Sequence, residues 1–384
     1  MGIFLLIVGL ILFIGLVVVH ELGHFWAARR GGVDVEEFGI FFPPRLYKRR
    51  TKAGYNFTVN LLPLGGFVKL KGEHDSDTEK GSYGAARTRT KVKIMLAGVF
   101  MNLVAALVLF TVLAWVGMPK LVDNQFTIKS DTHVVQNNVL ISYVEPHSPA
   151  SKAGLQLRDQ LVSIGGKKVT TSEALPGVTK QFAGEPTKVT YIRDGKTRNT
   201  TVTFRTAAAV AASKKTNSPK GYLGLEPTEF TLQRSTWSAP VVAVGLGAQL
   251  TALTYQGLGH ALAGVGGILS GAVTGNHAAR ENAQTEASSQ VSGPVGIFVI
   301  LKDGSLLGYQ FMLFIIAIIS LTLAIMNVLP IPALDGGRLF VMFISRLFKK
   351  RITPQTEEAI YGTSFAALML LIILITVVDV QRFF

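Results

Sequence analysis

The sequence predicts an α-helical polytopic membrane protein with four transmembrane helices, a membrane-associated β-hairpin or small sheet, and one soluble α+β domain. Three observations predict this class. Of the 384 residues, 48% are hydrophobic and only 16% are charged, which is low for a soluble protein. Several apolar runs have the length of about 20 residues that a helix needs to cross a bilayer. One long stretch between these runs is polar and rich in turn signals.

Composition also excludes some classes of protein. The net charge of +14 is compatible with nucleic-acid binding, but the basic residues cluster beside the apolar runs, as membrane topology demands, and no nucleic-acid motif is present. Cysteine is absent, so no disulfide framework and no cysteine zinc site can form. Any bound metal must therefore use His, Asp or Glu.

The first span is predicted within residues 1–30. Met1 to Val19 is uncharged and mostly large and apolar, and it lacks the basic start and the cleavage pattern of a secretory signal, so we expect a retained helix. His20 and His24 follow it. Two histidines four residues apart on a helix point the same way, so both imidazoles can reach one zinc ion, with Glu21 placed to take a proton from water. The structural alternative is a pair of interfacial histidines capping a membrane anchor.

The loop of residues 31–93 is predicted to be cytoplasmic. Between Arg29 and Lys93 there are 14 basic and 7 acidic residues, and the positive-inside rule places such loops in the cytoplasm. Residues 55–61 have strand composition, and 67–70 form a second run after the turn signal of 63–66, which predicts a small sheet or hairpin near the membrane. Its edge could bind an extended peptide by strand addition, or the hairpin could be purely structural.

The second span is predicted at residues 94–117 and returns the chain to the outside. Asn102 is the polar residue within it, and it either packs against a neighbouring helix or faces an active cavity.

The outside domain is predicted at residues 121–232. Residues 139–144 are a strand candidate, 148–155 begin like a short helix, and 156–166 read as turn, strand and turn. We expect a mobile Ala/Ser/Lys/Pro-rich insertion at 207–220 and a last strand at 221–225. This order, with Ala-Gly-Leu at 153–155 and Asp-Gln-Leu-Val-Ser-Ile-Gly-Gly at 159–166, resembles one PDZ domain of the bacterial type. PDZ modules bind peptides by strand addition, which suggests substrate filtering; the alternative is a rigid spacer.

Residues 237–300 are predicted to form a membrane-surface helix followed by a turn. No residue between Arg234 and Arg280 carries a formal charge, but Trp237 to Ala272 is rich in Gly and Ala and contains Gln249, Gln256 and His260. We therefore expect this helix to lie in the interface, with His260 outside any metal site and a turn at 292–296.

The third span is predicted at residues 309–337. Its apolar run contains Asn327 and is followed by Pro330 and Pro332, which break the helix, and by two glycines that permit a tight turn. Irregular backbone at membrane depth is tolerated only where protein or a wet cavity solvates it. Asp335 in this segment is the natural third metal ligand; the alternative is a helix cap.

Topology supports this ligand set. The two histidines follow the first span and Asp335 follows the third, so both spans must run the same way and an odd number of crossings must separate them. One crossing, at 94–117, meets this condition, whereas a crossing by 237–272 would place Asp335 on the wrong side. The loop 338–358 is expected in the cytoplasm because residues 338–351 hold five basic and no acidic residues. Residues 359–379 are the fourth span.

Three features together resemble the site-2 proteases, which are intramembrane zinc metalloproteases, in particular the bacterial members like the regulator-of-sigma-E protease. They are His-Glu-Leu-Gly-His at 20–24, the single PDZ-like domain, and Asn-Val-Leu-Pro-Ile-Pro-Ala-Leu-Asp-Gly-Gly at 327–337. The resemblance implies a catalytic core of the first three spans and one Zn²⁺ per chain. It implies His20, His24 and Asp335 as the zinc ligands and Glu21 as general base.

The resemblance also implies residues that line the substrate path. Gly98 and Asn102 match a Gly-x-x-x-Asn pattern beside the active region, and 65–69 match the strand that receives substrate. The substrate-binding residues predicted in this way are Asn327, Pro330, Asn102, Gly65, Gly66 and Phe67. One departure is Phe41, where relatives often have glycine.

The resemblance further implies a multi-pass protein of the bacterial cytoplasmic (inner) membrane, with the active site towards the cytoplasm and the PDZ domain outside. The implied substrates are single-span membrane proteins such as anti-sigma factors, first trimmed by a site-1 type protease, and signal-peptide remnants. Two other functions are compatible with the residues: a non-catalytic PDZ membrane scaffold and a metal-ion transporter. A transporter needs a polar path, and the spans carry few ionisable residues. No nucleic-acid partner is expected.

Overall fold

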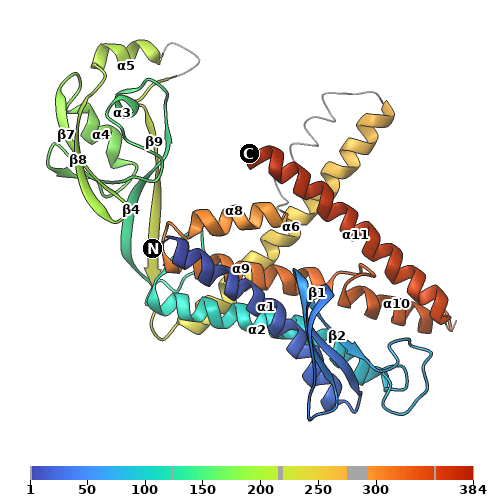
Figure 1. Ribbon diagram of the computed structural model, residues 1–384. Coiled ribbons are helices and arrows are strands. Elements are labelled where there is room, and N and C mark those ends of the chain that lie inside the picture. Colours follow the sequence, from blue (N-terminus) through green and yellow to red (C-terminus); the bar gives the residue numbers. More distant parts are fainter. Residues whose placement is uncertain (1, 123, 215–218, 275–292, 350–351, 384) are drawn as a thin grey trace. The chain divides into compact units, whose positions relative to one another are not determined.

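The computed structural model describes residues 2–122, 124–214, 219–274, 293–349 and 352–383, and the chain divides into two compact units. The helical unit comprises Met1–Leu113 and Ala239–Phe384, and the sheet unit comprises Ala114–Ser238. Figure 1 shows both units along the chain.

The helical unit is built from long apolar helices. Its helices are α1 (Gly2–Arg30), α2 (Thr88–Val116), α6 (Ala239–Thr274), α8 (Pro294–Gly304), α9 (Tyr309–Val328), α10 (Asp335–Leu347) and α11 (Pro354–Phe383). By length and composition alone, five helices of the described chain could cross a membrane: α1, α2, α9, residues 239–264 of α6 and residues 354–381 of α11. The four predicted spans are among them.

The region predicted as a membrane-surface helix forms one continuous helix, α6, of 36 residues. It lies against α2, where a Cβ on Gly247 would be 3.2 Å from Leu107. Its in-plane orientation stays a prediction. The turn predicted at 292–296 is wrong over its described part, because Pro294 begins α8, with Gly293 as its N-cap. Proline suits this first helical position because its missing N–H would have no partner there.

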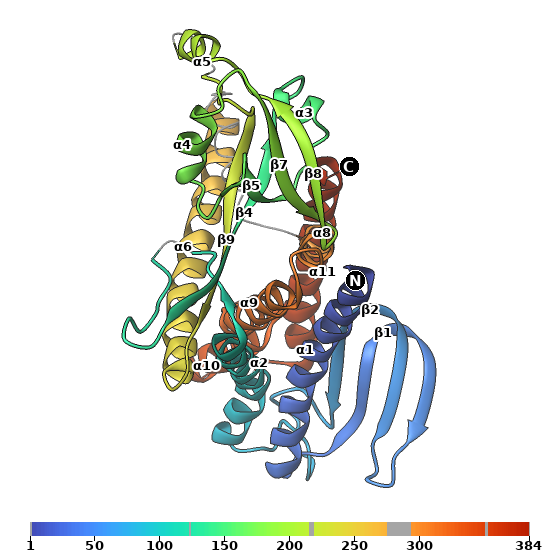
Figure 2. The ribbon, with the colours of Figure 1, turned by 90° about the vertical axis from the view of Figure 1, so that its left-hand side faces the viewer.

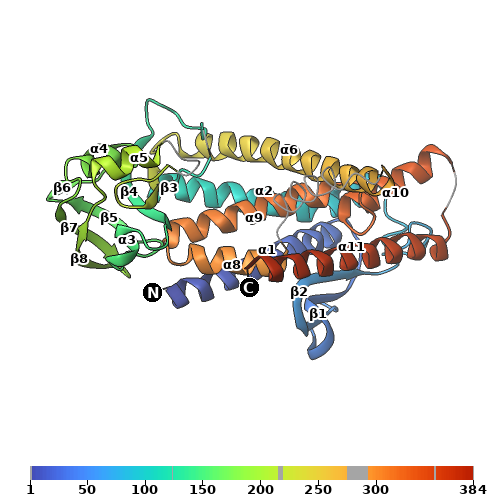
Figure 3. The ribbon, with the colours of Figure 1, turned by 90° about the horizontal axis from the view of Figure 1, so that it is seen from above.

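Three helices form the centre of the helical unit (Figure 3). Leu16 of α1 shares a buried cluster with Met312 and Ile316 of α9. Phe110 of α2 and Phe314 of α9 lie edge to face, with ring centroids 5.7 Å apart. The helices are those of the first, second and third predicted spans.

The predicted break after the third span is confirmed. Helix α9 ends at Val328 and α10 begins at Asp335. A Cβ on Gly336 or Gly337 would overlap the carbonyls of Val328 or Ile331, so the two glycines let α10 start close to the end of α9. The N-cap of α10 is Leu334, without a side-chain cap, so the alternative of Asp335 as a helix cap is wrong.

The small sheet or hairpin predicted within 55–70 is confirmed as a sheet, but its two runs pair with an earlier strand and not with each other. Residues 56–70 form one long strand, β2 (Asn56–Leu70), and its partner is β1 (Val35–Arg50). Ile40 is paired with both Gly66 and Val59, so the first half of β1 has neighbours on both sides. Pro43 and Pro44 lie within β1, although proline lacks the N–H that a strand uses for pairing. Phe41, the position where relatives often have glycine, has φ of 68°, a conformation that glycine adopts more easily.

The sheet unit is an antiparallel sheet closed by short helices (Figure 2). Its strands are β3 (Met118–Pro119), β4 (His133–Val144), β5 (Gln160–Ile164), β6 (Lys167–Lys168), β7 (Pro186–Arg193), β8 (Lys196–Thr203) and β9 (Leu225–Arg234). The order is β3-β9-β4-β5-β7-β8, with β6 beside β5. Its helices are α3 (Pro149–Lys152), α4 (Ala174–Lys180) and α5 (Ala207–Ser213).

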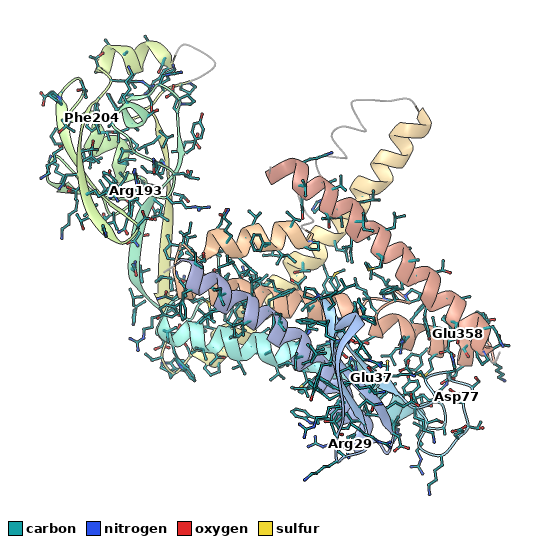
Figure 4. All side chains as sticks on the ribbon, in the orientation of Figure 1. Arg29, Glu37, Asp77, Arg193, Phe204 and Glu358 are labelled. Atoms are coloured by element: carbon teal, nitrogen blue, oxygen red, sulfur yellow. The ribbon has the colours of Figure 1, made fainter. Side chains whose placement is uncertain are left out.

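One apolar core holds the sheet unit together. Val139, Leu161, Val189 and Phe204 are among its buried members. Beside it, Arg193 donates two hydrogen bonds to the buried Asp159, at 2.7 and 2.6 Å; Figure 4 labels Arg193 and Phe204.

The strand predicted at 139–144, the helix near 148 and the strand within 156–166 are confirmed as β4, α3 and β5. The prediction of the last strand is wrong, because it begins only at Leu225, after Gly224 with its positive φ of 70°. Residues 207–213 of the predicted insertion form α5, capped by Thr206, since alanine is the strongest helix former. Mobility of the insertion stays a prediction, and residues 215–218 lie outside the described chain.

Candidate metal centre

The two motif histidines and Asp335 converge on one point of the helical unit. His20 Nε2 and His24 Nε2 lie 3.1 Å apart. Asp335 Oδ2 lies 3.2 Å from each of these nitrogens. The three side chains are largely buried, with 9–18% of each exposed. His24 and Asp335 are 311 positions apart in the chain, yet together with His20 they bring three possible ligand atoms close to one another.

These three residues fit a zinc ion. A tetrahedral zinc with ligands at about 2.0–2.1 Å places its ligand atoms roughly 3.3 Å apart, close to the distances observed here. Asp335 Oδ2 is buried without a hydrogen-bond donor, a costly state for a carboxylate that a cation relieves. No other His, Cys, Asp or Glu of the described chain joins this group. Three protein ligands leave a fourth position open, as in catalytic rather than structural zinc sites.

The second helix orients both imidazoles. His24 Nδ1 lies 2.8 Å from the carbonyl oxygen of Ile94, so Nδ1–H donates there and Nε2 keeps its lone pair. His20 Nδ1 lies 3.2 Å from the amide of Asn102, whose buried Oδ1 has no partner. Turning this amide by 180° lets Oδ1 accept from His20 Nδ1–H, which leaves His20 Nε2 free for a metal.

Asn102 is itself held from α9. Its backbone oxygen accepts a hydrogen bond of 2.8 Å from Ser320 Oγ. Asn102 is 1% exposed, and Ser320 is fully buried. The position of the His20 ring therefore depends on contacts among α1, α2 and α9.

Glycine lets α2 approach the histidines. A Cβ on Gly98 would overlap His24 Nε2 and lie 2.6 Å from His20 Cε1. On α1, a Cβ on Gly23 would lie 2.8 Å from the carbonyl carbon of Ala97. Real Cβ atoms essentially never come this close, so both positions are restricted to glycine. The structure thus brings Gly98 and Asn102, which the resemblance placed beside the active region, into contact with the histidine pair.

The sheet of the helical unit approaches Glu21. A Cβ on Gly66 of β2 would lie 3.0 Å from Glu21 Cγ and 3.2 Å from the carbonyl oxygen of Gly39. Gly65 lies against the ring of Phe42, and the Phe67 ring covers Gly39. Of the predicted substrate-binding residues on β2, Gly66 therefore touches the predicted base, while Gly65 and Phe67 pack against β1.

Asn327 and Pro330 lie on the segment that leads to Asp335. Asn327 is the penultimate residue of α9 and half-buried, and Pro330 is exposed in the break between α9 and α10. Neither has a hydrogen bond to the metal-centre residues of the described chain. Their role towards substrate stays a prediction.

Sequence reasoning missed three contributors to this site. The Ile94 carbonyl could not be found, because every residue carries one. Ser320 resembles an ordinary polar residue in a span. Arg338 was counted only as a basic charge, although it follows Asp335 by one helical turn; its guanidinium stacks on the Tyr361 ring at 5.2 Å.

Two imidazoles and a carboxylate around an open position, with a glutamate beside them on an apolar helix, define a metallohydrolase site within a membrane-type helical bundle. The chain belongs to peptidase family M50, the site-2 protease family, whose model matches residues 8–371. The protein is thus a zinc metalloprotease with Zn²⁺ as its cofactor. The scaffold and transporter alternatives are set aside.

Similar proteins support this assignment. Zinc metalloprotease RasP of Geobacillus kaustophilus is 26% identical, over 98% of this chain and 97% of its own. Relatives from Campylobacter jejuni and Clostridium perfringens, whose names describe zinc metalloproteases, are each 29% identical, over 96% and 98% of this chain and 90% and 98% of their own.

Proposed function

We propose that this zinc metalloprotease is an intramembrane endopeptidase that cuts single-span membrane proteins. In this proposal, His20, His24 and Asp335 hold the zinc, and Glu21 is the general base. The observation that carries it is the convergence of the three ligand atoms, 3.1–3.2 Å apart, on apolar helices. The orphaned Asp335 Oδ2 supports it independently.

Each residue of the site has a chemical task. Zinc, when bound, supplies Lewis acidity that polarises the scissile carbonyl and makes water easier to deprotonate. Glu21 takes the proton from the attacking water and passes it to the leaving amine. Ile94 and Asn102 hold the imidazole rings in the orientation that frees both Nε2 atoms.

A helical substrate must unwind before it is cut, because its carbonyls are hydrogen-bonded within the helix. Residues 66–70 of β2 support the proposal that an unwound segment joins the sheet. They pair with residues 35–40 on one side only, and Gly66 touches Glu21. A strand added at this edge would gain main-chain hydrogen bonds beside the base. Asn327 and Pro330 would contact its backbone from the other side.

The sheet unit would act as a substrate filter of the PDZ type on the outer side of the bacterial inner membrane. Its antiparallel sheet with three short helices supports this role. The basic loops around β1 and β2 support it too, because the positive-inside rule favours a cytoplasmic position for such loops. Anti-sigma factors trimmed by a site-1 type protease, and signal-peptide remnants, are the proposed substrates of this regulated intramembrane proteolysis.

The test is a Glu21→Gln variant, assayed in vesicles against a single-span protein without its outer domain. Loss of a general base should slow cleavage about 10²- to 10⁴-fold, while one zinc per chain remains bound. Glu79→Gln is the matched control, because Glu79 is exposed and its one ion pair among the described residues is with Lys71. Cleavage by Glu21→Gln at the wild-type rate would overturn the assignment of the base.

A further inference from the structure

Helix α10 has two faces with opposite surroundings. Asp335, Leu339 and Met342 follow helical spacing on one face, and Leu339 and Met342 are only 8% and 5% exposed. Phe340, Phe343, Ile344 and Leu347 repeat at i, i+3, i+4 and i+7 on the other face, and 37–73% of each is exposed. Phe348, 67% exposed, extends this apolar stripe (residues 340, 343, 344, 347 and 348) beyond the helix end.

Basic side chains surround the end of this stripe. Arg346 donates a hydrogen bond to Thr88 Oγ1, which brings the end of α10 to the start of α2. The exposed cations of these two segments form a basic collar: Arg87, Arg89, Lys93, Arg346 and Lys349.

The acidic groups next to the collar are already engaged. Asp75 Oδ1 lies 3.5 Å from Arg346 but forms its close ion pair with the buried Lys91. Glu357 accepts hydrogen bonds from the Asp75 amide and from the Tyr361 hydroxyl. The two segments that carry the collar, residues 87–93 and 346–349, contain no acidic residue, so their exposed charge is positive.

The position and length of α10 match one leaflet of a bilayer. It has 13 residues, a length of about 20 Å, which is too short to cross a membrane but spans about half of one with its headgroups. It lies between α9 and α11, both long and apolar enough to cross, and it leads away from the end of α9 (Figures 1 and 3). Aromatic residues next to arginine and lysine are typical of the interface with anionic lipid.

We propose that the apolar stripe of α10 lies in the acyl chains of one leaflet and that the basic collar binds the headgroup phosphates of anionic phospholipids. The stripe and Asp335 lie on different faces of one short helix, so they turn together. Lipid contact would thereby fix how Asp335 faces His20 and His24. This second step rests on the proposed role of Asp335 as a zinc ligand.

Fluorescence quenching tests the lipid contact without any measurement of activity. The three tryptophans, Trp26, Trp115 and Trp237, are first replaced by phenylalanine, and Phe348→Trp adds one reporter beside the collar. The protein is reconstituted in mixed phosphatidylglycerol and phosphatidylcholine vesicles, with bromine on the chains of one lipid or the other.

Brominated phosphatidylglycerol should quench Phe348→Trp at least two-fold more than brominated phosphatidylcholine at equal mole fraction, because one basic side chain enriches anionic lipid up to roughly five-fold. Arg346→Gln with Lys349→Gln should bring the ratio to about one. Leu371→Trp on α11 is the matched control, because Leu371 is 51% exposed and lies 11 positions from the one basic residue of that helix, Arg382. Equal quenching at Phe348→Trp, or none by either lipid, would overturn the proposal.

Activity tests the coupling to Asp335. Wild-type cleavage should fall several-fold in pure phosphatidylcholine, and the Arg346→Gln/Lys349→Gln variant should be equally slow in both lipids. Arg49→Gln with Arg50→Gln, exposed on β1, is the control that should behave like wild type. Equal wild-type rates in both lipids would overturn the coupling. Absence of cleavage in every lipid would instead overturn the proposed function, while the quenching result still decides the lipid contact.

Discussion

The two units of the chain differ in what lies at their centres. The sheet unit closes around an apolar core that includes Leu161 and Val189. The helical unit has polar groups at its centre, where His20, Asn102 and Ser320 are joined by hydrogen bonds across three helices. All three candidate metal ligands lie in the helical unit. We therefore expect zinc binding to depend on close helix approach in the helical unit. Changes in the sheet unit should alter stability or substrate choice and leave zinc in place.

The largest effect is expected from Gly98→Ala. The added methyl group overlaps His24 Nε2 and the His20 ring, so either α2 moves away or the histidines leave the ligand position. Zinc content and cleavage should both fall to background, as measured by metal analysis and by the vesicle assay.

Gly15→Ala on α1 is the matched control, since its Cβ would meet nothing within 4 Å. A Gly98→Ala protein with full zinc content would show that zinc binding does not need the close approach of α2 to the histidines. The proposed difference between the two units would then be wrong.

The next effect is expected in the sheet unit. Leu161→Ala empties a position that is 2% exposed, and such cavities cost about 2–5 kcal/mol. The melting transition of the sheet unit should shift down while the zinc content stays at the wild-type value. Leu157→Ala, 54% exposed, is the control. Zinc loss in Leu161→Ala would mean that the two units are not independent.

A smaller effect is expected from Asn102→Ala. It removes the group that orients His20, and loss of such a partner weakens metal binding about 10- to 100-fold. Competition with a zinc chelator measures this change. Thr111→Val serves as control, because the Thr111 hydroxyl on the same helix donates its hydrogen bond to the carbonyl oxygen of Leu107, within α2. An unchanged zinc affinity in Asn102→Ala would show that Asn102 packs between the helices without orienting His20 for the metal.

The smallest effect concerns acid stability of the sheet unit. Burial alone would raise the pKa of Asp131, but hydrogen bonds from Ser238 and Thr236 outweigh it and hold the pKa below its ordinary value of 3.8. Because the folded state has the lower pKa, the ionised carboxylate stabilises the fold above about pH 4, and this contribution is lost as the pH falls further. The melting temperature of Asp131→Asn should therefore change less between about pH 5 and 3 than that of wild type. If the melting temperatures of wild type and Asp131→Asn fall equally with pH, Asp131 does not stabilise the fold in this way.

The sequence predicted the metal centre better than its surroundings. Spacing placed His20 and His24 on one helix face, and helix-breaking prolines marked the segment that carries Asp335. The partners of the imidazoles could not be predicted, because the Ile94 carbonyl and the Ser320 hydroxyl matter only through the distances that packing creates. The resemblance supplied Gly98 and Asn102, but only the structure shows their contacts with the rings.

The sheets show the same limit. Alternation and turn signals located β4 and β5, which are regular. They did not locate β1, because two adjacent prolines are unusual within a strand. They also misplaced the start of β9, which begins after Gly224 with its positive φ. The Ala/Ser/Lys/Pro composition of residues 207–220 is typical of a linker and does not by itself predict helix α5. Thr206, whose side chain caps this helix, is the local signal for it.

The central claim is that His20, His24 and Asp335 hold one zinc ion while Glu21 does not. The most direct measurement is the zinc content of purified Asp335→Ala beside that of Glu21→Gln, each in the same vesicles as wild type. One zinc per chain in wild type and in Glu21→Gln, with little or none in Asp335→Ala, is the predicted result. A full zinc equivalent in Asp335→Ala would contradict it.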